Sequence, residues 1–67
     1  MTEDEFKALL HIKGQSLRIT KLAEGSPYFI GVVSDNKTFD GVLYAAGKSY
    51  NATVKAIIKA YYADNQQ

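Results

Sequence analysis

The clearest pattern of apolar positions lies near the C-terminal end of the chain, between Ser49 and Ala63. Large apolar and aromatic residues recur there at the spacing of one helical face: Tyr50, Val54, Ile57, Ile58, Tyr61 and Tyr62. Ser49 or Asn51 is the predicted N-cap, because both side chains accept hydrogen bonds from the first turn of a helix. No other segment carries as much apolar surface, so we expect the chain to fold around this helix.

A second helix is predicted at the N-terminal end, from Glu3 to about Ile12. Thr2 and Glu5 have the spacing of a capping box, in which each side chain accepts a hydrogen bond from the backbone of the other. Gly14 is the predicted stop, because glycine readily takes the left-handed conformation that ends helices. The short apolar stripe of this helix consists of Phe6, Leu9 and Leu10.

Three predicted strands lie between the helices. Ser16–Leu22 alternates between apolar and polar residues until Leu22 breaks the alternation, so we expect a bulge or an end near Thr20. Tyr28–Ser34 is rich in aromatic and β-branched residues, which favour strands. Thr38–Ala45 is the third predicted strand.

The turn before the third strand has two candidate positions. Asp35-Asn36 lies between the apolar segments and is a common turn sequence. Asp40-Gly41 is a strong two-residue hairpin signal inside the predicted third strand. The sequence leaves both positions open.

The order of elements predicts one small α+β domain, α-β-β-β-α, over residues 1–63, and a frayed tail over residues 64–67. Connections are short, so consecutive strands form a three-stranded antiparallel meander. We expect both helices to pack on one face of this sheet.

Strand alternation predicts large side chains on both faces of the sheet. Phe29 and Val33 point to one face, and Phe39 and Leu43 repeat this on the third strand. If both helices cover one face, the other exposes apolar residues, which is typical of an interface. The candidate interface residues are Tyr28, Ile30, Val32, Val42 and Tyr44. Which face is buried is left open, as is an arrangement with one helix on each side.

Composition excludes several classes of function. With no cysteine and one histidine, His11, a zinc site is not expected, and no group forms a catalytic pair with His11. No apolar run reaches the ~20 residues of a membrane span, and the acidic N-terminus is unlike a signal peptide. We therefore expect a cytoplasmic, non-enzymatic chain without a cofactor, a metal, a membrane partner or a small-molecule substrate.

Gly47-Lys48-Ser49 lies where a strand meets a helix and invites comparison with a phosphate-binding loop. That motif requires a glycine at position 42, and Gly41 is one place too early. The surrounding segment is nevertheless locally basic, and helix N-termini bind anions. The candidate nucleic-acid-binding residues are Lys48, Ser49, Lys55 and Lys59, with Arg18 and Lys21 on the first strand.

The α-β-β-β-α order resembles the double-stranded-RNA-binding domain, and Gly47-Lys48-Ser49 with the alanines that follow is similar to the start of that family's last helix. Tyr50 and Asn51 stand where the family carries two lysines, and Ser34-Asp35-Asn36-Lys37 stands where it carries a Gly-Pro-x-His loop. The resemblance implies a fold, and a shared fold alone does not carry function.

Two functions follow as hypotheses. The first is a small nucleic-acid-binding or regulatory module that contacts the phosphates of DNA or RNA through the lysine face and the start of the last helix. The second is an interaction module, acting as a homodimer, adaptor or inhibitor through an apolar sheet face. Net charge of +1 gives no general attraction to nucleic acid, so charge does not decide between them.

Overall fold

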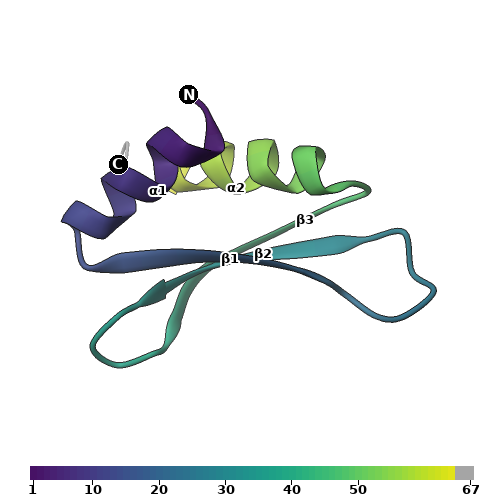
Figure 1. Ribbon diagram of the computed structural model, residues 1–67, viewed down its shortest axis with the longest axis horizontal. Coiled ribbons are helices and arrows are strands. Elements are labelled where there is room, and N and C mark those ends of the chain that lie inside the picture. Colours follow the sequence, from purple (N-terminus) through teal and green to yellow (C-terminus); the bar gives the residue numbers. More distant parts are fainter. Residues whose placement is uncertain (65–67) are drawn as a thin grey trace.

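The computed structural model describes residues 1–64 and has the predicted α-β-β-β-α order (Figure 1). Its elements are α1 (Glu3–Ile12), β1 (Gln15–Lys21), β2 (Phe29–Asp35), β3 (Gly41–Gly47) and α2 (Tyr50–Asp64). Asp64, assigned to the tail by the sequence, is the last residue of α2, and the rest of the predicted tail lies outside the described residues.

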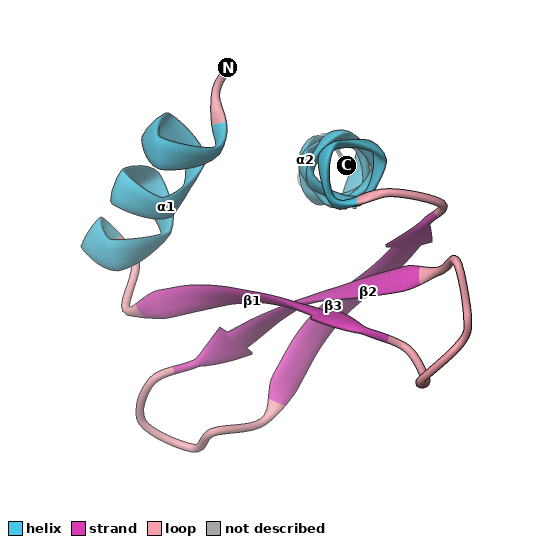
Figure 2. Cartoon of the chain, turned by 45° about the vertical axis from the view of Figure 1, so that its right-hand side comes forward, coloured by secondary structure: helices cyan, strands magenta, loops and turns pink. Residues whose placement is uncertain are grey.

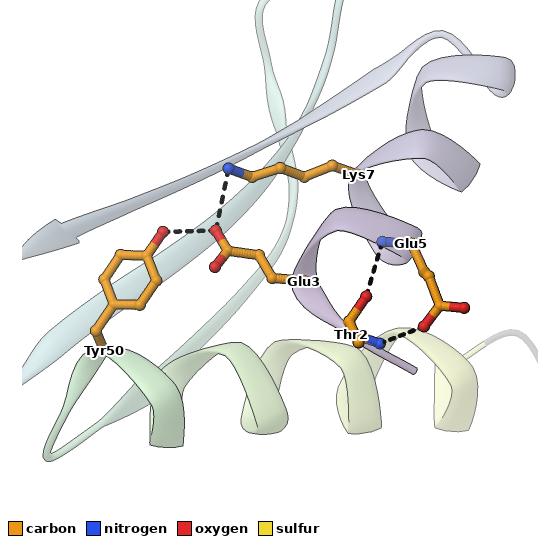
Figure 3. Close-up of polar contacts among 5 residues, drawn as sticks. All are labelled: Thr2, Glu3, Glu5, Lys7 and Tyr50. Carbon is orange, nitrogen blue, oxygen red and sulfur yellow. Dashed lines mark hydrogen bonds and ion pairs between the residues drawn. The ribbon is translucent and has the colours of Figure 1, made fainter.

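Helix α1 has the predicted bounds and the predicted cap. The Glu5 backbone N–H donates to the Thr2 hydroxyl at 3.2 Å, and the Thr2 N–H donates to the Glu5 carboxylate at 2.8 Å (Figure 3). These two bonds form the capping box and satisfy donors that a helix leaves free. Gly14 follows the helix with φ of +74°, as expected of a helix-ending glycine.

The sheet is an antiparallel meander in the order β1-β2-β3. The register between β1 and β2 is regular from Gln15 opposite Asp35 to Lys21 opposite Phe29. Of the two predicted alternatives, the strand therefore ends near Thr20, at Lys21, and has no bulge there. The register shift lies between β2 and β3, where Ser34 pairs with Gly41 and Val33 pairs with Leu43. Val42 is the extra residue of this bulge.

The connection between β2 and β3 occupies residues 36–40, hereafter the Phe39 loop. The Asp35 N–H donates to the Asp40 carbonyl at 2.9 Å, and Gly41 is the first residue of β3. Both predicted turn signals therefore belong to one loop, since Asp35-Asn36 opens it and Asp40-Gly41 closes it. The prediction that the third strand begins at Thr38 is wrong, and Phe39 lies outside the sheet.

The core lies between the helices and the sheet. Phe6 and Leu10 from α1 meet Val33 from β2 and Ile57 and Tyr61 from α2, and these five side chains are buried. The Phe6 and Tyr61 rings pack edge to face with centroids 5.3 Å apart. The apolar stripe of α2 therefore supplies core residues, while Tyr50 lies at its exposed margin.

Helix α2 approaches the sheet closely at residues without large side chains. A Cβ on Gly47 would lie 2.7 Å from the Thr53 backbone nitrogen, and a Cβ on Gly31 would lie 3.3 Å from Thr53 Cγ2. Thr53 is fully buried there, and its hydroxyl donates to the Ser49 carbonyl at 2.8 Å. Neighbouring Ala56 and Ala60 are half-buried, so small residues on both elements set the spacing.

Both helices lie on the same side of the sheet, and no element covers the other side within residues 1–64 (Figure 2). The buried face carries Leu17, Val33 and Leu43, which pack into the core. This arrangement settles which face is buried. The uncovered side is hereafter the open face.

A polar contact joins the first turns of the two helices (Figure 3). The Tyr50 hydroxyl donates to the Glu3 carboxylate at 2.5 Å, and Lys7 forms an ion pair with the same carboxylate at 3.0 Å. The hydrogen bond from Tyr50 and then the one from Lys7 lower the pKa of Glu3 below its ordinary value. The same contact with Glu3 raises the pKa of Tyr50.

This contact predicts a pH window of stability. Because the pKa of Glu3 is lowered, the contribution of Glu3 to the stability of the fold is present above pH 4.5 and is lost as the pH falls below that value. Because the pKa of Tyr50 is raised, its contribution is present below pH 10.0 and is lost as the pH rises above it. We expect Tyr50→Phe to lower the melting temperature inside this window and to approach the wild type at acidic pH.

Thermal melts followed by circular dichroism at a series of pH values measure this difference. Tyr62→Phe is the control, because the Tyr62 hydroxyl lies 3.4 Å from the Met1 sulfur, an uncharged atom that does not titrate. The difference in melting temperature between Tyr62→Phe and the wild type should not change on acidification. A Tyr50→Phe difference that stayed constant from about pH 3 to about pH 7 would contradict the contact.

Candidate functional site

The open face presents one side of all three strands. Alternation along the strands directs these residues away from the helices: Ser16, Arg18, Thr20, Ile30, Val32, Ser34, Val42, Tyr44 and Ala46. Arg18, Val32 and Tyr44 are aligned across the sheet as register partners. Arg18 is the charged member of this set, and its large members are apolar or aromatic.

Side chains in the middle of this face surround a shallow hollow of about 320 Å³. Its lining consists of Arg18, Val32, Ser34, Phe39, Gly41 and Tyr44. The Tyr44 ring leans along β3, because a Cβ added to Gly41 would run into its hydroxyl and its ring. Glycine at position 41 therefore leaves space for the ring to lie over the strand. Tyr44 is still 59% exposed in this position.

Phe39 stands at the rim of the hollow. Its side chain is 85% exposed, and its backbone has φ of +63°, the left-handed region that bulky residues rarely adopt. Such a backbone costs about 1–2 kcal/mol for a residue with a Cβ. Within residues 1–64, Phe39 is the non-glycine residue with a positive φ. The position therefore combines backbone strain with an aromatic ring in water.

Hydrogen bonds hold the Phe39 loop in place. The Phe39 N–H donates to the Asp35 carbonyl at 2.8 Å, and the Asp35 carboxylate accepts from the N–H groups of Lys37 and Thr38 at 2.7 and 3.1 Å. These two backbone donors lower the pKa of Asp35. The Asn36 N–H also donates to the Gly14 carbonyl at 2.9 Å. The loop therefore fixes the place from which Phe39 projects.

The predicted interface residues lie where the strand alternation places them. Val42 and Tyr44 are exposed on the open face, and Ile30 and Val32 are half-buried there. Tyr28 is exposed directly before β2. The sequence assigned Phe39 to the opposite face with Leu43, and the structure corrects this because Phe39 belongs to the loop and lines the hollow. The sequence signal that could have found this residue is a single aromatic residue among polar ones, in the segment from Asp35 to Asp40.

The predicted phosphate-binding residues do not converge. Lys55 and Lys59 are exposed on α2, and Lys48 is exposed in the turn before it, all on the helical side. Arg18 lies on the open face, on the other side of the sheet, and Lys21 is exposed at the end of β1. The sequence grouped these cations, but the sheet separates Arg18 from the α2 lysines.

Ser49 has a structural role in this region. Its hydroxyl accepts from the Ala52 N–H at 3.0 Å, and its carbonyl accepts from the Thr53 N–H at 3.0 Å. Ser49 is therefore the N-cap of α2, which decides between the two predicted caps. An anion at this terminus would compete with the Ser49 hydroxyl for the Ala52 donor.

The remaining features are sparse. Over the described part of the chain, no helix is long and apolar enough to cross a membrane, and no cluster of three acidic or histidine side chains has the arrangement of a metal site. A groove between the start of α1 and α2 is lined by Thr2, Glu3, Val54 and Ile58 among others, and Thr2 and Glu3 are engaged in the contacts described above.

Comparison with protein-family models, with curated proteins and with solved structures found no match to this chain, so its own geometry carries the functional argument.

Proposed function

We propose that this chain is a small non-catalytic protein-interaction module that associates with a second copy of itself through the open face. The observation that carries the proposal is the uncovered sheet face with the Phe39 loop at its edge, where Phe39, Tyr44 and Val42 are 85%, 59% and 50% exposed. Contiguous exposed apolar residues of this kind are typical of interfaces in soluble proteins.

The chemistry of the open face fits a protein better than a polyanion. Aromatic residues and arginine dominate the binding energy of protein interfaces, and Tyr44, Phe39 and Arg18 lie around one hollow. Arg18 is the charged residue among the strand positions of this face, whereas nucleic-acid surfaces gather many cations. The exposed lysines of α2 lie on the other side of the molecule.

The size of the face suits weak association. Full burial of an aromatic side chain removes about 150–250 Å² from water, so the exposed fractions of Phe39, Tyr44 and Tyr28 amount to roughly 350 Å² per copy. The aliphatic side chains of the face raise this toward the ~600 Å² per copy below which interfaces are weak or transient. We therefore expect a dissociation constant above about 1 µM.

Sedimentation equilibrium tests the proposal. The mass should rise from 7.4 kDa toward twice that value between about 10 µM and about 1 mM protein. We expect the double variant Val42→Thr, Tyr44→Thr to weaken association at least tenfold, because threonine keeps strand propensity but removes most of the apolar surface. A mass that stayed at 7.4 kDa throughout would contradict the proposal.

The matched control replaces Lys48, Lys55 and Lys59 with glutamine on the helical side of the molecule. This variant should associate like the wild type. The same variant tests the nucleic-acid hypothesis, which predicts binding to DNA or RNA that weakens steeply with salt and with the loss of these lysines. Fluorescence anisotropy with labelled single-stranded and duplex oligonucleotides measures it.

A further inference from the structure

We propose that the two open faces meet about a two-fold axis so that Phe39 of each copy occupies the hollow beside Arg18, Val32 and Tyr44 of the other. This inference rests on the proposed function and names the contact that gives the association its geometry. Three observations support it: the strained backbone and exposed ring of Phe39, the size and chemistry of the hollow, and the presence of both on one face of the chain.

Phe39 is unfavourable in the isolated chain. A glycine at φ of +63° would remove the backbone strain, and a polar side chain would suit its 85% exposure. Strained residues that the surrounding structure holds in place are concentrated at binding sites. The hydrogen bonds of the Phe39 loop hold this residue in position, so the ring is presented to a partner without further ordering of the loop.

The hollow has the size and the chemistry to receive a phenyl ring. A cavity of about 150 Å³ lined by apolar side chains holds benzene, and this hollow measures about 320 Å³. Val32 supplies aliphatic surface, and the Tyr44 ring supplies an aromatic surface for edge-to-face packing. The Arg18 guanidinium lies at the same site and favours the face of an aromatic ring.

The projecting ring and the receiving hollow lie on one face of one chain. A two-fold contact requires this arrangement, because each copy then offers the other the same surface. Figures 1 and 2 show the loop between β2 and β3 on the side of the sheet away from both helices, so the helices do not obstruct a facing copy.

Phe39→Gly separates a role in association from a role in folding. We expect its dissociation constant to rise at least tenfold by sedimentation, while its melting temperature at low concentration stays the same or rises because the strain is removed. A purely structural role would lower the melting temperature. A dissociation constant within about twofold of the wild type would overturn the inference and leave the proposed function standing.

Complementation tests the geometry. One copy carries Phe39→Gly and keeps the Arg18, Val32 and Tyr44 side chains that receive the ring. The other copy carries Ser34→Tyr, which fills the hollow and keeps Phe39. Neither variant can make the contact with itself, but a mixed pair retains one Phe39 in one hollow. We expect the mixture to associate at least severalfold more tightly than either variant alone.

Each result decides the question. A mixture no tighter than its components, with both variants folded by circular dichroism, would overturn the facing arrangement. If Ser34→Tyr does not fold, Phe39→Gly alone remains decisive. A wild type that stays monomeric, with an affinity for oligonucleotides that Phe39→Gly reduces, would overturn the inference and the proposed function and would make the open face a nucleic-acid site.

Discussion

Replacing Ile57 with alanine should lower the free energy of unfolding by about 3 kcal/mol, because the substitution removes three buried carbons and leaves a cavity. Ile57 is fully buried and contacts core residues from both helices and the sheet. A domain of this size has a total stability of roughly 3–10 kcal/mol, so much of the population would unfold near physiological temperature.

Ile12→Ala is the matched control for this prediction. Ile12 is the last residue of α1 and is 82% exposed, so the same chemical change should cost less than about 0.5 kcal/mol. Urea unfolding followed by circular dichroism measures both variants. A loss below about 1 kcal/mol for Ile57→Ala would show that α2 does not pack on the sheet through this residue.

Gly47→Ala should lower the free energy of unfolding by about 3 kcal/mol, although it adds a single methyl group. The new Cβ would lie 2.7 Å from the Thr53 backbone nitrogen and 2.9 Å from the Ala52 carbonyl carbon. These are backbone atoms in the first turn of α2, so the clash cannot be relieved by rotating a side chain. The helix would have to move away from the sheet and would weaken the packing of Thr53 and Ile57.

Gly14→Ala separates steric overlap from backbone strain. Gly14 has φ of +74° and no atom within 4 Å of an added Cβ. Its substitution should therefore lower the free energy of unfolding only through backbone strain, by about 1–2 kcal/mol. Gly47 has no positive φ, so its cost is steric. The same urea titration compares the two, and a Gly47→Ala cost no larger than that of Gly14→Ala would contradict the close approach of α2.

The sequence predicts the elements well where the signal is local. The bounds of α1 are correct because the capping box and Gly14 act within a few residues. The order of elements is also correct, and Ile30, Val32 and Tyr44 share one face of the sheet as alternation along β2 and β3 predicts.

Other features depend on contacts between distant segments. The burial of Thr53 requires α2 to cross the sheet at Gly31 and Gly47, and glycine in a strand has several explanations until the facing element is known. Phe39 reads as a strand residue because it continues the apolar alternation, but the Asp35 side chain closes the loop around it. The separation of Arg18 from the α2 lysines depends on which face of the sheet the helices cover.

The order β1-β2-β3 places each strand beside the next one in the chain. Both hairpins can therefore close over short loops, for which the entropic cost of joining the ends is small. The contacts of greatest sequence separation join the two ends of the chain, as in the Tyr62 contact with Met1 and the ring pair of Phe6 and Tyr61. The slow step in folding should accordingly be the docking of the two chain ends over a meander that is already paired.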